Sequence, residues 1–206
     1  RGRIEKVARE IPAGRVDRIM DAGGKYLLPG FIDDQVHFRE PGLTHKATIS
    51  TESAAAVAGG ITSYMDMPNT IPNVTSRPVL MDKYRLARGR SHANYSFYFG
   101  AANDNLDEIR GLRPGDCCAV KMFMGSSTGN MLVDDPATLE RIFAECPMLI
   151  ATHCEDTPMI KANEERFRQQ YGDEVPFSAH PQIRSPESAY KSSELAVNLA
   201  KRHNAR

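Results

Sequence analysis

Five polar side chains stand at or near the ends of predicted β-strands, where parallel-sheet enzymes carry their chemistry. His37 and Arg39 close the first strand, Asn69 follows the second, Lys121 lies within the fourth and His153 follows the fifth. Imidazole nitrogens are common zinc ligands. One histidine at a strand end is more often a hydrogen-bonded loop residue. Two at equivalent ends favour a ligand role, so we predict a metal site that includes both histidines.

Lys121 lies inside an apolar run, Ala119–Phe123. Burying a lysine is costly unless the amine is paired or modified. One interpretation is that the side chain points outward or reaches a rim with its charged end. The other is that the amine has become a carbamate, whose anionic oxygens can bridge two metal ions. The sequence leaves both interpretations open.

Further polar residues follow the same strands and are candidates by position: Asp33, Asp34, Gln35, Glu40, Asp66, Thr70, Glu155 and Asp156. The adjacent Asp33 and Asp34 fit a metal carboxylate or a strand-end cap equally well. The loop Gly125–Gly129 lacks the Gly-Lys-Ser/Thr ending of a phosphate-binding loop. We therefore predict that this loop lies beside the active site and does not hold a phosphate.

Strictly alternating strands and helices position these residues. The predicted strands are 27–38, 61–67, 94–99, 119–124 and 148–152. The predicted helices are 49–58, one from about 77, 106–112, 135–145, 158–170 and 186–203. This alternation predicts an α/β fold with a parallel sheet, either a (β/α)8 barrel or an open doubly wound sheet. Five strands cannot close an eight-stranded barrel, so we expect an open sheet or an incomplete chain.

The first 25 residues differ from the rest of the chain in their residue pattern. They are polar, with alternating apolar positions, and we predict small strands joined by turns at 12–14 and at Gly23–Gly24. The chain begins with Arg1 and not with methionine, and its first segment does not resemble a signal peptide. We expect the natural start to lie upstream.

The composition argues against several classes of protein. The 26 basic and 26 acidic residues cancel to a formal net charge of zero, so nothing predicts capture of nucleic acid or an anionic membrane surface. No apolar run approaches the length of a membrane span. The four cysteines contain no C-x-x-C pair, which predicts reduced thiols and a cytoplasmic protein.

Four motifs resemble those of the dihydroorotases, which are cyclic amidohydrolases. They are GFIDDQVHFREPG at 30–42, DMPNT at 66–70, KMF at 121–123 and THCE at 152–155. The combination of the first two motifs is specific. Allantoinases and dihydropyrimidinases share the barrel and the lysine, but they typically differ at the positions of Arg39 and Asn69.

The resemblance implies an amidohydrolase-type (β/α)8 TIM barrel. Residues 26–206 would form about its first five β/α units, and residues 1–25 would form part of a small β-sandwich. The family reaction is the reversible cyclisation of N-carbamoyl-L-aspartate to dihydroorotate in pyrimidine biosynthesis. A homodimer with a small-molecule substrate is also implied.

The resemblance also implies a role for each matching residue. His37 and His153 would bind one or two zinc ions (Zn²⁺), and Lys121 would be the carboxylated lysine that bridges them. Arg39 and Asn69 would hold the free carboxylate of the substrate, for which the planar guanidinium is well matched. The metal would supply a nucleophile and polarise the ring carbonyl.

Two departures from the family pattern stand out. The family carries His-x-His on its first strand, and Gln35 replaces the first histidine. Glutamine is a weak zinc ligand, and Asp34 is the nearest residue that could compensate. The family's sixth-strand histidine and eighth-strand aspartate have no counterpart before Arg206. We interpret His180, in a predicted loop, and His203, near a helix end, as ordinary surface residues.

Three functions remain open on the sequence. A dihydroorotase leads, because Arg39 and Asn69 match that family. Another cyclic amidohydrolase, an allantoinase or hydantoinase, is the second. The third is a non-catalytic, dihydroorotase-like partner protein, favoured by Gln35 and by the missing aspartate.

Overall fold

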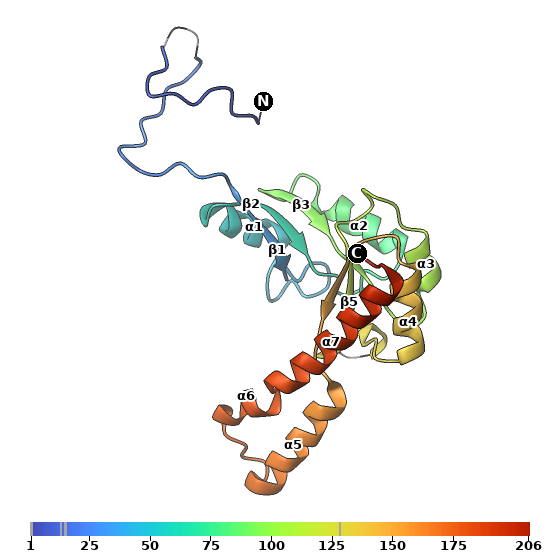
Figure 1. Ribbon diagram of the computed structural model, residues 1–206. Coiled ribbons are helices and arrows are strands. Elements are labelled where there is room, and N and C mark those ends of the chain that lie inside the picture. Colours follow the sequence, from blue (N-terminus) through green and yellow to red (C-terminus); the bar gives the residue numbers. More distant parts are fainter. Residues whose placement is uncertain (1, 13, 15, 128) are drawn as a thin grey trace.

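The computed structural model describes residues 2–12, 14, 16–127 and 129–206, and its centre is a parallel β-sheet (Figure 1). The strands form two groups of three, in the orders β1-β2-β3 and β4-β5-β6, and every pair is parallel. Their bounds are β1 Phe31–Val36, β2 Ile61–Asp66, β3 Asn94–Phe97, β4 Phe99–Gly100, β5 Val120–Phe123 and β6 Ile150–His153. The predicted α/β fold with a parallel sheet is confirmed.

β3 and β4 are consecutive parts of one strand position, divided at Tyr98. The Tyr98 amide donates to the Asp66 carbonyl (3.0 Å), and the Phe99 amide donates to the Ala119 carbonyl (3.0 Å). The backbone therefore changes from pairing with β2 to pairing with β5 at this point. Five strand positions follow one another in chain order, as predicted, although the predicted strand 94–99 is interrupted.

Four helices cover one face of the sheet: α1 Ile49–Ala58, α2 Arg77–Ala87, α3 Leu106–Arg110 and α4 Pro136–Glu145. α1 begins at a capping box in which Thr48 accepts from the Thr51 amide, and α4 begins where Asp135 accepts from the Thr138 amide. The main core lies between sheet and helices and contains buried side chains such as Tyr64, Phe97 and Ile142.

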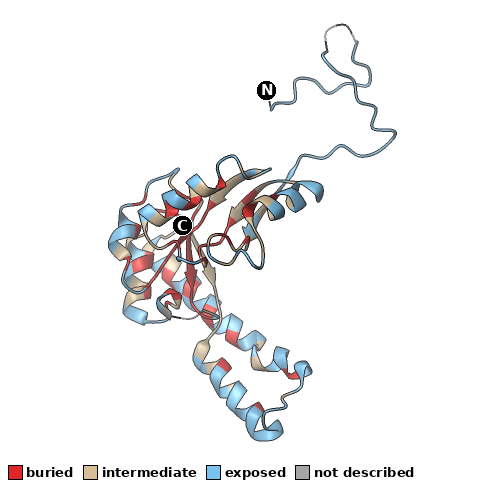
Figure 2. Cartoon of the chain, turned by 180° about the vertical axis from the view of Figure 1, so that it is seen from behind, coloured by how far each residue is buried: buried red, intermediate tan, exposed pale blue. Residues whose placement is uncertain are grey.

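The last helices form an arm that projects from the sheet (Figures 1 and 2). It comprises α5 Thr157–Tyr171, η2 Phe177–Ala179, α6 His180–Ile183 and α7 Pro186–His203. α7 returns to the sheet, where the Arg206 carbonyl accepts from the Ile150 amide (2.7 Å). The loop predicted around His180 is wrong, because this residue begins α6. Pro181 is tolerated there, since the first turn of a helix needs no amide donor.

The segment before β1 differs from the prediction. Within the described residues up to Gly30 no strand forms, and Figure 1 shows this segment leading away from the sheet. Strand backbone needs a partner for its amides and carbonyls, and no described segment pairs with this one. The first strand likewise begins at Phe31 and not at Leu27, which is 94% exposed.

Of the two turns predicted before β1, the one at Gly23–Gly24 is confirmed. Both glycines have positive φ, and the Lys25 amide donates to the Ala22 carbonyl (3.0 Å). The turn at 12–14 includes Ala13, which lies outside the described residues.

The structure bears on two features expected from the composition, the state of the cysteines and the length of the apolar helices. Cys117, Cys118, Cys146 and Cys154 all carry free thiols, as predicted. Among the helices of the described ranges, none combines the length and the apolar composition needed to cross a bilayer.

Candidate metal and substrate site

His37 and Asn69 meet at the carboxyl ends of β1 and β2. The two strands are parallel and in register at Val36 and Asp66, so the residues that follow them emerge at the same edge of the sheet. The His37 Nδ1 and Asn69 Oδ1 atoms are 3.0 Å apart. With the amide oxygen as acceptor, Nδ1 carries the proton and Nε2 keeps its lone pair. The Asn69 amino group then faces away and is free to donate.

His37 is half-buried, and its electrostatic surroundings favour the neutral imidazole. Burial, followed by the positive charges of Arg39 and Lys121, lowers the pKa of His37 below its ordinary value. The neutral ring is the form that binds a metal ion.

Lys121 is buried, with 3% of its surface exposed. Its strand neighbours Val120 and Met122 belong to the core beneath the helices, so by strand alternation the lysine points to the opposite face. Its Nζ lies 5.2 Å from the centre of the Phe123 ring, and burial lowers the pKa of Lys121. The outward or rim position is therefore wrong.

No carboxylate forms an ion pair with Lys121 within the part of the chain that the structure describes. A buried amine without a counter-charge favours its neutral form. The neutral amine is the nucleophile that can take up carbon dioxide and become a carbamate. This environment fits the second interpretation of Lys121.

His153 ends β6 and forms a charged network with later residues. Its Nε2 lies 3.0 Å from Glu155 Oε2, which also accepts from Arg184 Nη1 at 2.6 Å. The same guanidinium nitrogen donates to Ser126 in the loop after β5. His153 is part of the same sheet edge as Lys121, because β5 and β6 pair in register from Val120 to Phe123. Its ring nitrogen, however, is engaged by Glu155.

The β1 strand is irregular where Gln35 lies. Asp33 pairs with Tyr64 and Val36 pairs with Asp66, so β1 carries one extra residue between these positions, a β-bulge. The Gln35 amide donates to Asp33 Oδ1 at 3.1 Å, which makes Asp33 a local backbone cap. The side chain of Gln35 is exposed, as is Asp34. Ligation of a metal by Gln35 stays a prediction.

Arg39 sits in a constrained loop. Its φ of 66° is in the left-handed region, which is costly for a residue other than glycine and is common at functional sites. Gly42 has a φ of 84°, and a Cβ there would stand 2.3 Å from the Ile71 carbonyl oxygen. The Ile71 amide in turn donates to the Pro41 carbonyl (3.2 Å). The loops after β1 and β2 therefore support each other around Arg39 and Asn69.

Three predicted candidates have structural partners. Glu40 is buried, accepts from the Ile49 amide (2.8 Å) and pairs with Arg90 (2.7 Å). Asp156 accepts from the Met159 amide and caps α5. Asp66 lies beneath α2, where it pairs with Lys83 at 2.8 Å.

Lys83 and Arg184 were not predicted from the sequence. Lys83 is spaced three residues after Leu80 and four before Ala87, the other buried positions of α2, and this helical spacing was the available signal. Arg184 carries no comparable signal, because it is 29 residues from Glu155 along the chain.

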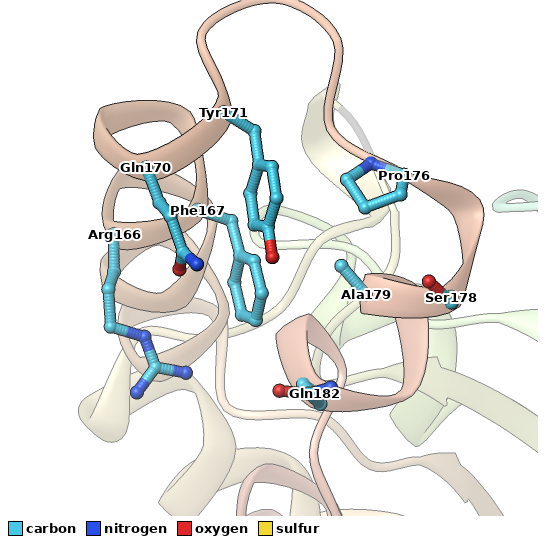
Figure 3. Close-up of a pocket in the computed structure, with 8 residues that line it drawn as sticks. All are labelled: Arg166, Phe167, Gln170, Tyr171, Pro176, Ser178, Ala179 and Gln182. Atoms are coloured by element: carbon cyan, nitrogen blue, oxygen red, sulfur yellow. The ribbon is translucent and has the colours of Figure 1, made fainter.

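A polar pocket of about 300 Å³ adjoins Asn69. Its walls carry amide and hydroxyl groups, and its lining residues are Asn69, Thr70, Ile71, Asn73, Ser126, Ser127 and Met131. This agrees with the predicted place of the loop Gly125–Gly129 beside the site, although Thr128 lies outside the described residues. A second pocket, of about 290 Å³, lies on the arm between α5 and α6 (Figure 3) and contains none of the predicted site residues.

The residues present fit a divalent cation in part. The lowered pKa of His37 favours its neutral ring, which offers Nε2, Lys121 is buried with a lowered pKa, and His153 ends the neighbouring strand β6. Among the described residues, no group of three histidine, cysteine, aspartate or glutamate side chains could hold a metal. A complete site therefore needs an anionic oxygen from Lys121 or ligands from elsewhere in the protein.

Comparison with known proteins agrees with the resemblance. The family described as "Dihydro-orotase-like" matches residues 24–101. A dihydroorotase from Methanosarcina acetivorans is 35% identical over the whole chain, and an allantoinase from Streptomyces avermitilis is 35% identical over 80% of it. The chain spans 44% and 38% of these relatives, which is less than half of each.

The solved L-hydantoinase (dihydropyrimidinase) of Arthrobacter aurescens has a similar fold. It superposes with a TM-score of 0.83 at 28% identity, over 93% of this chain and 43% of that one. Fold and motifs together place the chain in the cyclic amidohydrolase class. Within that class, the chain belongs to the dihydroorotase-like family.

Proposed function

We propose that the complete protein carrying this chain is a dihydroorotase, which interconverts N-carbamoyl-L-aspartate and dihydroorotate in pyrimidine biosynthesis. The observation that carries the proposal is the contact between His37 and Asn69 (3.0 Å) beside Arg39. The proposal is supported because a neutral imidazole and two groups that could donate to a carboxylate would then share one edge of the sheet. Dihydroorotases are also among the relatives at 34–36% identity.

Arg39 and Asn69 would bind the free carboxylate of the substrate. The guanidinium presents paired N–H donors, which match the two carboxylate oxygens. Asn69 keeps its oxygen on His37, so its amino group is available as a further donor. Hydantoin and allantoin lack this ring carboxylate, and so the two donors favour dihydroorotate over these rings.

His37, Lys121 and His153 would hold one or two zinc ions, with Lys121 in its carbamate form. A bound zinc ion activates a nucleophile at neutral pH and polarises the carbonyl of the scissile amide. The protein's part is to keep His37 neutral and Lys121 buried, and to orient His153 through Glu155. Hydrogen bonds of this outer kind orient metal ligands.

Two other functions remain candidates. Allantoinases and an L-hydantoinase are among the relatives at 28–35% identity, which supports another cyclic amidohydrolase. Gln35, in place of the family's first histidine and with an exposed side chain, supports a non-catalytic partner protein.

The wider architecture is part of the same proposal. We infer a (β/α)8 barrel begun by residues 26–206, with residues 1–25 in a small β-sandwich, in a cytoplasmic homodimer. The Arg206 carbonyl supports this, because it pairs with the free edge of β6, where the next parallel strand of a barrel would start.

The experiment is a substrate panel on the complete protein. The kcat/KM values for dihydroorotate, allantoin and hydantoin are compared. We expect kcat/KM for dihydroorotate to be higher by roughly 10²-fold or more, which corresponds to the binding free energy of one charge-assisted pair. A preference for allantoin or hydantoin would transfer the proposal to that reaction. No turnover of any of the three would favour the non-catalytic partner.

A further inference from the structure

A fully buried ion pair lies behind the candidate site, on the helix-covered face of the sheet. Lys83 Nζ on α2 is 2.8 Å from Asp66 Oδ2 at the end of β2, and the two side chains are 0% and 1% exposed. Burying two charges costs desolvation energy, and apolar replacements of similar volume are often neutral or stabilising. Stability alone is therefore a weak reason for this pair.

The hydrogen bonds of the pair to the backbone reach the ends of β1 and β2. Asp66 Oδ1 accepts from the Phe38 amide at 3.0 Å. Lys83 Nζ donates to the Met67 carbonyl at 2.9 Å and lies 4.9 Å from the centre of the Phe97 ring. Phe38 directly follows His37, and Met67 stands two residues before Asn69. The ion pair thus bonds the backbone on both sides of the His37–Asn69 contact.

The β-ladder does not provide this link. β1 bulges between Asp33 and Val36, and the pairing of the two strands ends with the Met67 amide bonded to the Val36 carbonyl (2.9 Å). Beyond that bond, Asp66 Oδ1 continues the connection next to His37 by its bond to Phe38, and the Ile71 amide joins the two loops farther on by its bond to the Pro41 carbonyl.

We propose that Asp66 and Lys83 are positioning residues for the site. Their buried ion pair sets the separation of the β1 and β2 ends, and so the contact between the His37 ring and Asn69. The expected change in kcat/KM rests on the proposed function. The expected change in the His37–Asn69 contact can be observed without turnover.

Two double variants of the complete protein test the role. Asp66→Leu with Lys83→Met removes every polar contact at similar volume. Asp66→Asn with Lys83→Gln removes the charges but keeps an acceptor for Phe38 and a donor for Met67. The matched control is Arg77→Met with Asp116→Leu, which removes a partly exposed ion pair of similar length (2.9 Å) between α2 and the loop before β5.

Three readouts are taken: the ¹⁵N signals of the His37 ring, the zinc dissociation constant and kcat/KM. In the apolar variant we expect shifted His37 signals and zinc affinity and kcat/KM each about tenfold lower, as for other groups that orient metal ligands. The amide variant should stay within about threefold of the wild type, and the control should be unchanged.

An apolar variant with wild-type thermal midpoint, His37 signals, zinc affinity and kcat/KM would overturn the inference. If that variant does not fold, Asp66→Asn with Lys83→Met decides, because it keeps an acceptor for the Phe38 amide and differs from the amide variant only by the loss of the donor to Met67. A rise in KM of about threefold would then support the role, and wild-type values would refute it. A wild-type protein that does not turn over dihydroorotate would refute the proposed function. The ¹⁵N signals of the His37 ring would still test whether Asp66 and Lys83 position that ring.

Discussion

The two ends of the candidate site are held by different means. At the β1–β2 end, His37 and Asn69 contact each other above a buried ion pair, and two loops brace each other. At the β5–β6 end, His153 is held by Glu155 and Arg184, whose side chains are partly exposed. Buried contacts fix geometry more strictly than exposed ion pairs, which solvent and salt weaken.

This difference suggests a division of labour. Under the proposed function, the β1–β2 end would recognise the substrate carboxylate, for which fixed donors are an advantage. The β5–β6 end joins the loop after β5, through Ser126, to the arm, through Arg184. We therefore expect that end to adjust more easily when a ligand binds. Lys121, on β5, is buried, and no described carboxylate forms an ion pair with it.

Replacing Lys121 should have the largest effect, because under the proposed function its carbamate form would bind zinc. We expect Lys121→Ala to lower kcat by roughly 10³-fold, the scale of losing metal-assisted charge stabilisation. Burial lowers the pKa of this lysine, so between that pKa and the value of the unfolded chain the unfolded state binds more protons. The metal-free protein should therefore become more stable as pH rises toward about 10.

Steady-state kinetics and pH-dependent thermal melts in buffer free of carbon dioxide measure both effects. Lys121→Met, which keeps the volume of the side chain, should reduce the rise in stability with pH in this range, while the buried Lys83, whose pKa is also lowered, keeps its own contribution. A near-normal kcat in Lys121→Ala or Lys121→Met would show that turnover does not depend on Lys121.

Arg39→Ala should have the next largest effect, and it tests the rigid end. Losing a charge-assisted pair to the substrate carboxylate should raise KM about 10- to 100-fold. Arg39→Lys, which keeps the charge but not the planar fork, should fall in between. Unchanged KM and kcat in the alanine variant would refute the carboxylate role.

Arg184→Met probes the adjustable end. The loss of its bonds to Glu155 and Ser126 should weaken zinc binding about tenfold, as for other groups that orient metal ligands. Arg202→Met is the matched control, because Arg202 also pairs with a glutamate (2.8 Å) but lies near the end of α7. Equal zinc affinities in Arg184→Met and Arg202→Met would contradict a specific role of Arg184 in zinc binding.

The smallest expected effect is a pH dependence at the same end. Burial alone would raise the pKa of Glu155, but hydrogen bonds from His153 and Arg184 lower it overall. A depressed carboxyl pKa stabilises the fold above the unfolded value of about 4.3, and this contribution is lost as pH falls through the folded value.

Thermal melts of Glu155→Gln measure it. The variant should melt about 2 °C below the wild type at pH 6 and coincide with it near pH 3. Glu140→Gln, at an exposed ion pair, should change less. A gap between Glu155→Gln and the wild type that does not close on acidification would contradict the assignment.

Much of the fold was predictable, because alternating strands and crossover helices have distinct periodicities. The strand-end positions of His37, Asn69 and His153 followed from the same pattern. The β-bulge before Val36 was not predictable, since it breaks the period-two alternation on which strand prediction depends. The roles of Lys83 and Arg184 depend on contacts between elements far apart in the chain. The small strands expected before β1 need partners that no described segment supplies.

The most direct measurement of the central claim is turnover of dihydroorotate by the complete protein before and after metal removal. The protein should be assayed as purified, after exhaustive chelation, and after zinc and bicarbonate are restored. We predict activity in the first sample, loss of roughly 10³-fold in the second and recovery in the third. Activity that survives chelation would contradict a metal-dependent site at His37 and Lys121. Absence of activity in all three samples would contradict the dihydroorotase proposal itself.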